Sequence, residues 1–504
     1  MELGTGNEPM STDTERRSPA CALVIFGASG DLTARKLLPA LARLAAYGAL
    51  PAEIALIGVA RTPMTDDEFS SYCRAAVAGT ADARWSAIAD SVRYVHGDYD
   101  DPATYARLAE VLADCDRLQG TDGNRVYYFS TPPRLFSPIA LSIGKAGLGT
   151  PAGESFVRAV IEKPFGWDDT SARELYADLS TAFVEDQIFR IDHYLAKETV
   201  QNLLALRFAN SIFEPIWNRT WVDNVQITVA ETLGVGGRGG FYETTGAMRD
   251  IVQNHVLQVL SLFLMEPPTS FHAEAIRDEK VKLLRAIRPL DDEAEIAARA
   301  VRGQYTRGGT REELMPGYRE EPGVDPLSAT ETFVAMRLNV QNWRWNGVPV
   351  YVRTGKRLPE RVTEVAMQFH RPPHLPLFPG TDALEPDALI VRVQPDEGLS
   401  LRFGAKVPGH AFRVQKASMD FSYESFDQKS IDAYERVLLD ALIGDHTLFI
   451  RADEVGRSWR IVDPVLQYWS ADSRPIPLYQ AASWGPPEAD TLIARDGRSW
   501  RHST

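Results

Sequence analysis

The sequence has few cysteines and no long apolar run. Its three cysteines, Cys21, Cys73 and Cys115, are far apart and match neither a zinc-ligand nor a redox spacing. This usage favours a reducing compartment, so we expect a cytoplasmic protein. No stretch of eighteen apolar residues occurs, and we therefore expect no contact with a membrane. The first twenty residues are polar and lack the apolar stretch of a secretory signal, which predicts a disordered tail over residues 1–20.

Positive charge is also scarce. The chain of 504 residues has 54 Lys and Arg against 68 Asp and Glu, for a formal net charge of -14. We expect no nucleic-acid partner, because an acidic chain without a basic stripe lacks the charge that nucleic acids require. Any site for an anionic ligand must be a local cluster of basic side chains and backbone N–H groups. The length and a hydrophobic fraction of 44% are sufficient for more than one hydrophobic core.

The first part of the chain alternates short apolar segments with stretches long enough to form helices. Strands are expected at residues 22–26, 54–59, 92–95, 126–129, 156–161 and 188–191. This alternation is typical of a doubly wound parallel sheet. We therefore expect an α/β domain of the Rossmann dinucleotide-binding type over residues 21–192.

Beyond residue 192 the pattern changes. Helices are expected over residues 199–208 and 246–264. Extended segments are expected at residues 225–229, 332–340, 349–353, 363–369, 389–393 and 399–403. Many strands with helices segregated between them predict a larger α+β domain with a mainly antiparallel sheet, over residues 193–504.

A glycine turn joins the first expected strand to the first helix. It reads Gly27-Ala28-Ser29-Gly30-Asp31-Leu32. The order strand, glycine turn, helix delivers helix N-terminal N–H groups to a pyrophosphate, so we expect this turn to bind a dinucleotide. The spacing departs from the full G-x-G-x-x-G fingerprint, and an ordinary strand–helix connection is the alternative.

Basic residues stand where two later strands of this domain end. Arg61 follows the second strand, and no Asp or Glu occurs before Asp66. An acidic residue at this place holds the ribose of NAD, whereas arginine accommodates the 2′-phosphate of NADP. We expect NADP, with NAD as a poorer alternative; a solvated arginine is the other interpretation. Lys163 follows a later strand, and Pro164 biases it toward an extended backbone, which helps to aim its ammonium toward the expected nicotinamide; a solvated surface lysine is the alternative.

The most concentrated polar motif follows the last strand of this domain. It reads Arg190-Ile191-Asp192-His193-Tyr194-Leu195-Ala196-Lys197-Glu198. We expect it to open a helix, so that His193 and Lys197 share one face beside Tyr194. Two potential cations and a phenol near a helix N-terminus would form a phosphate site. An exposed helix face of mixed polarity is the alternative.

One histidine lies within the apolar stripe of the expected helix 246–264. His255 falls among Met248, Ile251 and Val252, where it is either a core residue or a general base. Asp250 lies about 140° away around an α-helix, so we expect it to contact substrate rather than His255. The carboxylate that orients His255 must then come from elsewhere, and Asp192 is the candidate.

A basic turn follows an expected strand and reads Arg353-Thr354-Gly355-Lys356-Arg357-Leu358-Pro359-Glu360-Arg361. Most such runs are exposed charge, which is the alternative to a binding role.

Together the motifs resemble the glucose-6-phosphate dehydrogenase family. The family's G-A-S-G-D-L, E-K-P-F-G, R-I-D-H-Y-L-G-K-E and R-D-x-x-Q-N-H motifs match residues 27–32, 162–166, 190–198 and 249–255. Matches continue through residues 342–345 and 353–356 to residues 483–486.

The resemblance implies NADP-linked oxidation of glucose 6-phosphate at C1 to 6-phosphoglucono-1,5-lactone, the first step of the oxidative pentose phosphate pathway. His255 would be the general base, and Asp192 would hold its imidazole. The implied substrate contacts are Lys163, His193, Tyr194, Lys197, Glu231, Asp250, Lys356 and Arg361. The implied cofactor contacts are Gly27, Ser29, Gly30, Asp31, Leu32, Lys36, Arg61 and Lys163. The resemblance implies no metal, and it implies a homodimer or homotetramer.

Two departures from the family pattern and two alternative functions accompany this interpretation. Thr33-Ala34 stands where the family usually has Ala-Lys, and Ala196 replaces a usual glycine. Another two-domain sugar oxidoreductase would carry E-K-P, but is not expected to have D-H-Y and Q-N-H together. A non-catalytic NADPH sensor on the same fold would have no reason to retain His255 with Asp192.

Overall fold

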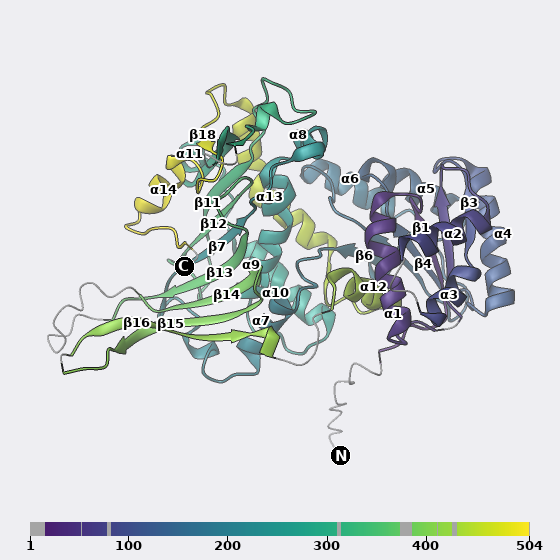
Figure 1. Cartoon of the computed structure of the whole chain (residues 1–504), viewed down its shortest axis with the longest axis horizontal. Helices are drawn as coiled ribbons and strands as arrows, with labels where there is room; N and C mark the ends of the chain where they lie inside the picture. Colours follow the sequence, from purple (N-terminus) through teal and green to yellow (C-terminus); the bar gives the residue numbers. More distant parts are fainter. Residues whose placement is uncertain are drawn as a thin grey trace, which may run out of the picture.

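The computed structural model describes residues 16–51, 53–77, 82–309, 314–372, 386–410, 412–425 and 431–502. Within these ranges, one sheet consists of β1 (Ala22–Phe26), β2 (Ala55–Ala60), β3 (Arg93–His96), β4 (Arg125–Phe129), β5 (Val157–Ile161), β6 (Ile188–Ile191) and β17 (Phe449–Ile450). Their order is β17-β6-β5-β4-β1-β2-β3 (Figure 1). The strands β1 to β6 run parallel. Each expected strand is present, with ends that differ by at most one residue.

Helices follow most strands of this sheet. They are α1 (Leu38–Ala46), α2 (Asp66–Ala76), α3 (Ala83–Asp90), α4 (Pro102–Gln119), α5 (Phe136–Lys145) and α6 (Asp169–Leu179). A π-helical turn, η2 (Thr33–Leu37), leads into α1. The burial pattern explains why these strands read as continuous apolar runs, because β1, β2 and β4 are buried along their whole length.

The second sheet is larger and mainly antiparallel. Its described strands are β7 (Val222–Ala230), β8 (Ala300–Thr306), β11 (Phe333–Asn339), β12 (Pro349–Gly355), β13 (Val362–Phe369), β14 (Ala388–Gln394), β15 (Gly398–Lys406), β16 (Val414–Ser422) and β18 (Leu478–Gln480). Their order is β16-β15-β14-β13-β7-β12-β11-β8-β18, and β9 (Gly308–Gly309) pairs separately with β10 (Leu314–Met315). The pairs β7–β12 and β8–β18 are parallel, and the other pairs are antiparallel. The expected fold class is confirmed; β8, β16 and β18 were not among the expected strands.

The helices of the second half are α7 (Glu198–Phe208), α8 (Gly239–Ala247), the π-helical η7 (Met248–Val256), α9 (Leu257–Leu264), α10 (Ala273–Ala286), α11 (Glu293–Arg299), α12 (Ala433–Ile443), α13 (Ala452–Ala471) and α14 (Pro487–Ala494). The helices α9, α10 and α13 lie between the second sheet and the first domain (Figure 1). No helix in the described ranges combines the length and apolar character needed to cross a membrane.

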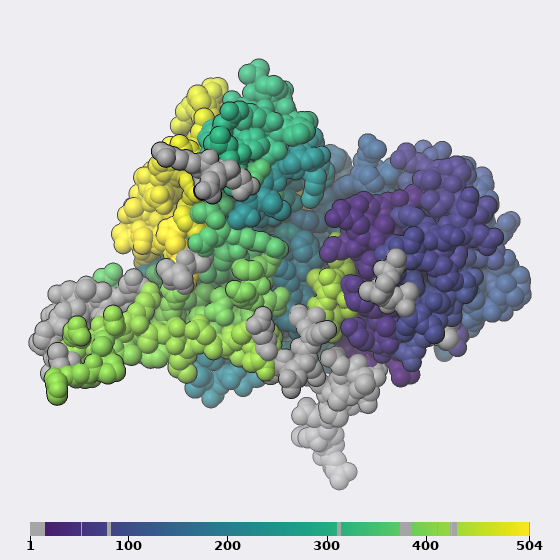
Figure 2. All heavy atoms as spheres, viewed as in Figure 1, coloured from purple at the N-terminus to yellow at the C-terminus, as the bar shows by residue number. Residues whose placement is uncertain are grey.

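Two elements from late in the sequence join the first domain. β17 pairs antiparallel with β6. The helix α12 packs on α1, where Glu435 forms an ion pair with Arg43. In the space-filling view the yellow-green residues of α12 lie against the purple residues of the first domain (Figure 2). The first domain is therefore completed by residues more than 400 positions into the chain.

The segment before β1 also packs on this domain. Residues 1–15 of the expected tail lie outside the described residues. Ser18 is buried, and its N–H donates to the carbonyl of Ala49 at 2.9 Å. Arg16 pairs with Asp440 of α12 at 3.1 Å. Residues 16–20, which we expect from the sequence to belong to the tail, are thus ordered against α1 and α12.

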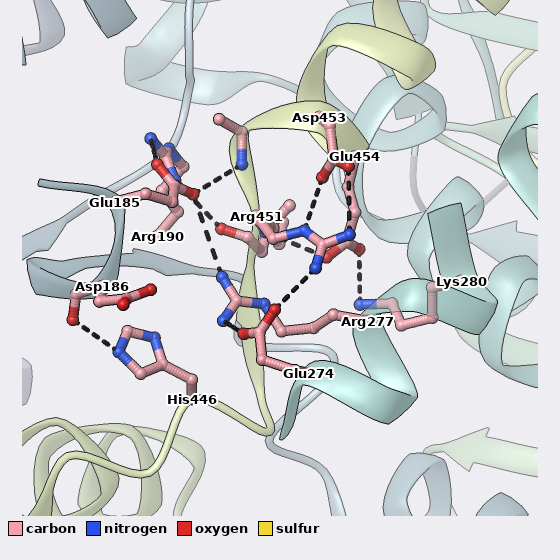
Figure 3. Close-up of polar contacts among 12 residues, drawn as sticks. Glu185, Asp186, Arg190, Glu274, Arg277, Lys280, His446, Arg451, Asp453 and Glu454 are labelled. Atoms are coloured by element: carbon pink, nitrogen blue, oxygen red, sulfur yellow. Dashed lines mark hydrogen bonds and ion pairs between the residues drawn. The ribbon is translucent and has the colours of Figure 1, made fainter. Parts of the chain in front are cut away.

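Charged side chains join β6 to α10 and α13 (Figure 3). Glu185, just before β6, accepts two bonds from Arg190 at 2.7 and 3.0 Å. It also accepts the first N–H of α13, from Ala452, at 2.9 Å. Nearby, Lys280 of α10 and Glu454 of α13 form an ion pair of 2.7 Å, with both side chains almost fully buried. These contacts fix β6, the strand that precedes Asp192, relative to the second domain.

Candidate active site

The helix that carries Asp250 and His255 is wound differently from the α-helix expected here. Its residues from Met248 to Val256 form a π-helix, in which hydrogen bonds join residues five apart. Asp250 and His255 therefore project to the same side, and the expected 140° separation is wrong. The Lys163 ammonium contacts both of them, at 3.1 Å from Asp250 Oδ1 and 2.9 Å from His255 Nε2.

His255 is paired with Asp192, as expected. The Nδ1 atom of His255 lies 2.5 Å from Oδ1 of Asp192, and each side chain is only 1% exposed. A proton on Nδ1 leaves Nε2 as the acceptor, and Nε2 faces Lys163. Burial lowers the pKa of His255, while Asp192 acts in the opposite direction. Burial alone would raise the pKa of Asp192, but His255 holds it well below its ordinary value.

The motif after β6 forms a turn, so the expectation of a helix over His193–Lys197 is wrong. The Tyr194 N–H donates to Asp192 Oδ1 at 2.9 Å, and the Leu195 N–H donates to the Asp192 carbonyl at 3.0 Å. These bonds close the turn on Asp192, and α7 begins only at Glu198, with Lys197 at its N-cap. The turn still lies at the N-terminus of a helix, α7, which favours the binding of an anion such as phosphate.

The side chains of this turn gather around His255. The Tyr194 ring stacks on the imidazole of His255 with centroids 4.3 Å apart, and the His193 ring meets it edge-on at 4.5 Å. The Lys197 ammonium lies 4.7 Å from the centre of the Tyr194 ring. Burial lowers the pKa of Lys197 to about 8, and Glu397 acts against this. Burial, and then His255, hold the pKa of His193 well below its ordinary value, which leaves Lys197 as the cation.

Glu231 and Lys356 form an ion pair beyond the carboxyl ends of two central strands of the second sheet. Glu231 follows β7 and Lys356 follows β12, and the parallel pairing of these two strands brings their carboxyl ends together. Lys163 and then Lys356 lower the pKa of Asp250 to about 2, against the effect of burial. Arg361 donates to Gln394 at 2.7 Å. Its charge also acts on Lys197. The structure thus groups the expected substrate residues in one region.

A cavity of about 390 Å³ lies at the carboxyl ends of β1, β2 and β4. It is lined by Gly27, Ser29, Gly30, Arg61, Thr62, Tyr99, Ser130, Thr131, Pro132 and Leu135. Gly27 has a φ of +84°, and a Cβ there would lie 2.2 Å from the Ser130 carbonyl oxygen. The turn therefore permits a close backbone approach that any other residue would block. Asp31, Leu32 and Lys36 do not line this cavity; Lys36 lies 5.9 Å from the Tyr434 ring.

Sequence reasoning missed some residues at both sites. Tyr99 lines the dinucleotide cavity, with its ring centre 6.0 Å from the Arg61 guanidinium, and lies in the loop after β3, two residues beyond Gly97. Gln394, the last residue of β14, approaches Arg361, and Glu397, in the connection to β15, acts on Lys197. No local pattern marks these residues, because their position depends on how the second sheet folds over α7.

Comparison with known proteins agrees with this geometry. Residues 24–202 match the family model "Glucose-6-phosphate dehydrogenase, NAD binding domain", and residues 204–501 match "Glucose-6-phosphate dehydrogenase, C-terminal domain". A glucose-6-phosphate 1-dehydrogenase 2 of Mycobacterium tuberculosis is 46% identical, over 98% of this chain and 97% of that protein. A glucose-6-phosphate 1-dehydrogenase of Aggregatibacter actinomycetemcomitans is 47% identical, over 95% of this chain and 97% of that protein.

Solved structures are similar over almost the whole chain. A glucose-6-phosphate dehydrogenase in complex with its substrate glucose-6-phosphate has a TM-score of 0.88 and 34% identity, covering 98% of this chain and 100% of that one. A glucose-6-phosphate 1-dehydrogenase from Mycobacterium avium has a TM-score of 0.82 and 38% identity, covering 97% and 99%. With both domain models matched in order, the chain belongs to the glucose-6-phosphate dehydrogenase family.

Proposed function

We propose that this chain oxidises D-glucose 6-phosphate at C1 to 6-phosphoglucono-1,5-lactone with NADP⁺, the first step of the oxidative pentose phosphate pathway. One observation carries the proposal. His255 has Nδ1 bound to Asp192 at 2.5 Å and Nε2 in contact with Lys163 at 2.9 Å. A neutral imidazole held in this way presents Nε2 as a general base.

The residues divide the reaction between them. His255 Nε2 takes the proton of the C1 hydroxyl as the C1–H bond breaks and its hydride leaves. Asp192 then stabilises the imidazolium, as the orienting carboxylate does in other histidine-based sites. Lys163, which contacts both Asp250 and His255, would bridge the sugar and the cofactor. A general base of this kind contributes about 10²–10⁴-fold to the rate, and positioning supplies the rest.

Substrate recognition is assigned to side chains on both domains. Lys197 and Arg361 supply positive charge for the 6-phosphate, and His193 and Tyr194 supply hydrogen bonds. Glu231 and Asp250 accept hydrogen bonds from sugar hydroxyls, and Lys356, paired with Glu231, orients that carboxylate. Because the chain has a net charge of -14, an anionic substrate needs a local cluster of basic groups, and these side chains provide one.

The cavity beside the glycine turn fits a dinucleotide. Gly27 lets the turn lie against the Ser130 backbone, where a Cβ would clash, and Gly27, Ser29 and Gly30 line the cavity in which a pyrophosphate would bind. Arg61 lies on its wall, where it would hold the 2′-phosphate of NADP. When bound, NADP⁺ supplies the hydride acceptor. Asp31, Leu32 and Lys36 lie outside the cavity lining and would contribute from its rim. Asp31 and Leu32 belong to the glycine turn that leads into the helix, and Lys36 would contribute positive charge near the cofactor phosphates.

The test follows formation of reduced nicotinamide by absorbance at 340 nm, using purified protein, glucose 6-phosphate and either NADP or NAD. Unphosphorylated glucose is the matched control for the phosphate site. Rapid reduction of NADP with the phosphorylated sugar, and little with glucose, is expected. Folded protein that reduces neither cofactor would discard the catalytic assignment and favour an NADPH sensor.

Assembly and location belong to the same proposal. We infer a homodimer or homotetramer in the cytoplasm. The nine-stranded sheet offers a large surface for a second copy, and the described cysteines are all free thiols. Sedimentation velocity of the purified chain tests the oligomeric state, and a monomer at micromolar concentration would contradict it.

A further inference from the structure

The helix that carries Asp250 and His255 starts just after a residue with non-helical backbone geometry. Gly246 has φ 64° and ψ 175°, which lies outside the helical region and interrupts the path from α8 into η7. The first N–H groups after such a break have no acceptor within their own helix. These N–H groups belong to Ala247 and Met248, and Asp250 follows only two residues later.

Glu331 accepts both of these N–H groups. Its backbone carbonyl accepts the N–H of Ala247 at 2.9 Å, and its side-chain Oε1 accepts the N–H of Met248 at 3.1 Å. Glu331 lies two residues before β11, far from the helix in sequence, and is 7% exposed. Its backbone and side chain together cap the start of η7.

Gly246 and Glu331 occupy complementary space. A Cβ on Gly246 would lie 2.3 Å from Glu331 Oε1 and 2.6 Å from its Cδ. The carboxyl group therefore fills the place that a side chain at position 246 would take. The left-handed backbone at Gly246 is also one that other residues rarely adopt. The break and its cap form a single unit, which defines where the helix begins.

The charge of Glu331 suits this place. A carboxylate at a helix N-terminus interacts favourably with the helix dipole. Burial raises the pKa of Glu331, whereas the Met248 N–H and two basic side chains, Arg249 on the helix itself and Arg302 on β8, act to lower it. Arg249 also donates to the carbonyl of Trp167 at 2.9 Å, in the loop that follows Lys163. Through Arg249, the capped helix is therefore bonded to the loop of the first domain that carries Lys163.

We propose that Glu331 is a positioning residue for the reaction, because its cap sets the rotation and axial position of the turn that carries Asp250 and His255. The inference rests on the proposed function. The Lys163 ammonium bonds to the carbonyl and Oδ1 of Asp250 at 3.2 and 3.1 Å and to His255 at 2.9 Å. A helix start displaced by about 1 Å would break this arrangement, and such misplacement can cost about 10²-fold in rate.

Two substitutions separate the hydrogen bond from the charge. Glu331→Ala removes the side-chain acceptor, whereas Glu331→Gln keeps an acceptor oxygen without charge. We expect Glu331→Ala to lower kcat/KM for glucose 6-phosphate at least tenfold and Glu331→Gln to lower it less than threefold. The Kd of NADP, measured by tryptophan fluorescence, should stay within twofold in both, because the cofactor cavity lies on the first sheet.

The matched control is Glu364→Ala. Glu364 is another buried glutamate of the second sheet, bonded to Arg501 at 2.8 Å. We expect this variant to lose thermal stability, with kcat/KM of the folded protein within twofold of native. Circular dichroism and the Tm of each variant show that the assays are made on folded protein.

Three results would overturn the inference: native kcat/KM in folded Glu331→Ala, equal losses in the Ala and Gln variants, or an equal loss in Glu364→Ala. If Glu331→Ala does not fold, Glu331→Asp, which withdraws the carboxylate by one methylene, must lose at least threefold in kcat/KM. A native value in Glu331→Asp would then contradict the cap. Failure of the native chain to reduce NADP with glucose 6-phosphate is a different result and contradicts the proposed function instead.

Discussion

His255 and Asp192 lie 63 residues apart in the sequence, yet His255 Nδ1 is 2.5 Å from Asp192 Oδ1. Asp192 directly follows β6 of the first sheet, and His255 lies on the π-helix η7, which packs beside β7 and β12 of the second sheet. The pair therefore spans the junction of the two domains. Because both side chains are 1% exposed, the imidazole is held in one tautomer away from bulk water.

Replacing His255 with Asn should separate binding from chemistry. Asn keeps polarity and similar size but cannot take a proton near neutral pH. We expect kcat to fall at least a hundredfold, while the Kd of glucose 6-phosphate stays within about threefold. Stopped-flow reduction of NADP and equilibrium binding measure the two quantities. A folded variant with near-native kcat would remove His255 from the mechanism.

The acidic limb of activity should reflect the environment of His255. The base must be neutral, so activity falls as the pH drops through its pKa. Burial lowers that pKa, which places the limb below about 6.5. Asp192→Asn removes a charge that raises the pKa, so the limb should move to still lower pH while kcat falls. Titration of the sugar phosphate affects the native enzyme and the Asp192→Asn variant equally, so the difference between their pH profiles reports on His255. An acidic limb that moves to higher pH in Asp192→Asn would contradict the assignment of His255 as the base.

Lys197 predicts a second pH effect, on substrate affinity. Burial lowers its pKa to about 8, so the ammonium loses its proton as the pH rises through that value. We expect KM for glucose 6-phosphate to rise above about pH 8 in the native enzyme. In Lys197→Arg, where the charge persists, KM should stay flat over pH 7–9.5, whatever its absolute value. Parallel profiles in the two enzymes would show that another group recognises the phosphate.

Arg61 should control the choice between the two nicotinamide cofactors. It lines the dinucleotide cavity at the end of β2, where the 2′-phosphate of NADP is expected. We expect Arg61→Ala to raise KM for NADP at least tenfold and KM for NAD less than twofold. Initial rates with each cofactor at saturating glucose 6-phosphate provide the measurement. Equal changes would mean that the 2′-phosphate is bound elsewhere.

The buried pair Lys280–Glu454 makes a prediction about stability. Its atoms lie 2.7 Å apart, at the distance of an ion pair, with side chains 1% and 0% exposed. Lys280→Met would leave the Glu454 carboxylate buried without its partner, which typically costs about 3–5 kcal/mol. Urea denaturation should show this loss in the free energy of unfolding. The matched control is Lys282→Met, an exposed pair with Glu279, which should change it by less than about 1 kcal/mol.

Much of the fold follows from local pattern. The six strands β1 to β6 were expected within one residue, because strands buried on both faces read as short apolar runs between turns. The strands β8 and β16 were not expected; in β16 only Ala417 to Ser422 alternate apolar with polar residues, and the strand is largely exposed. The two-residue strand β17 is too short to carry any period.

The sequence by itself determined the fold class and pointed to His255, Asp192, Lys163 and the polar motif after β6 as the candidate reacting residues. Only the tertiary structure decided how these residues meet. The π-helical winding that aligns Asp250 with His255 begins at Met248, just after the non-helical Gly246, and its first N–H groups are accepted by Glu331, which precedes the distant strand β11. Periodicity reports which face of a helix is buried, but it cannot report a winding or a cap imposed by contacts far away in the sequence.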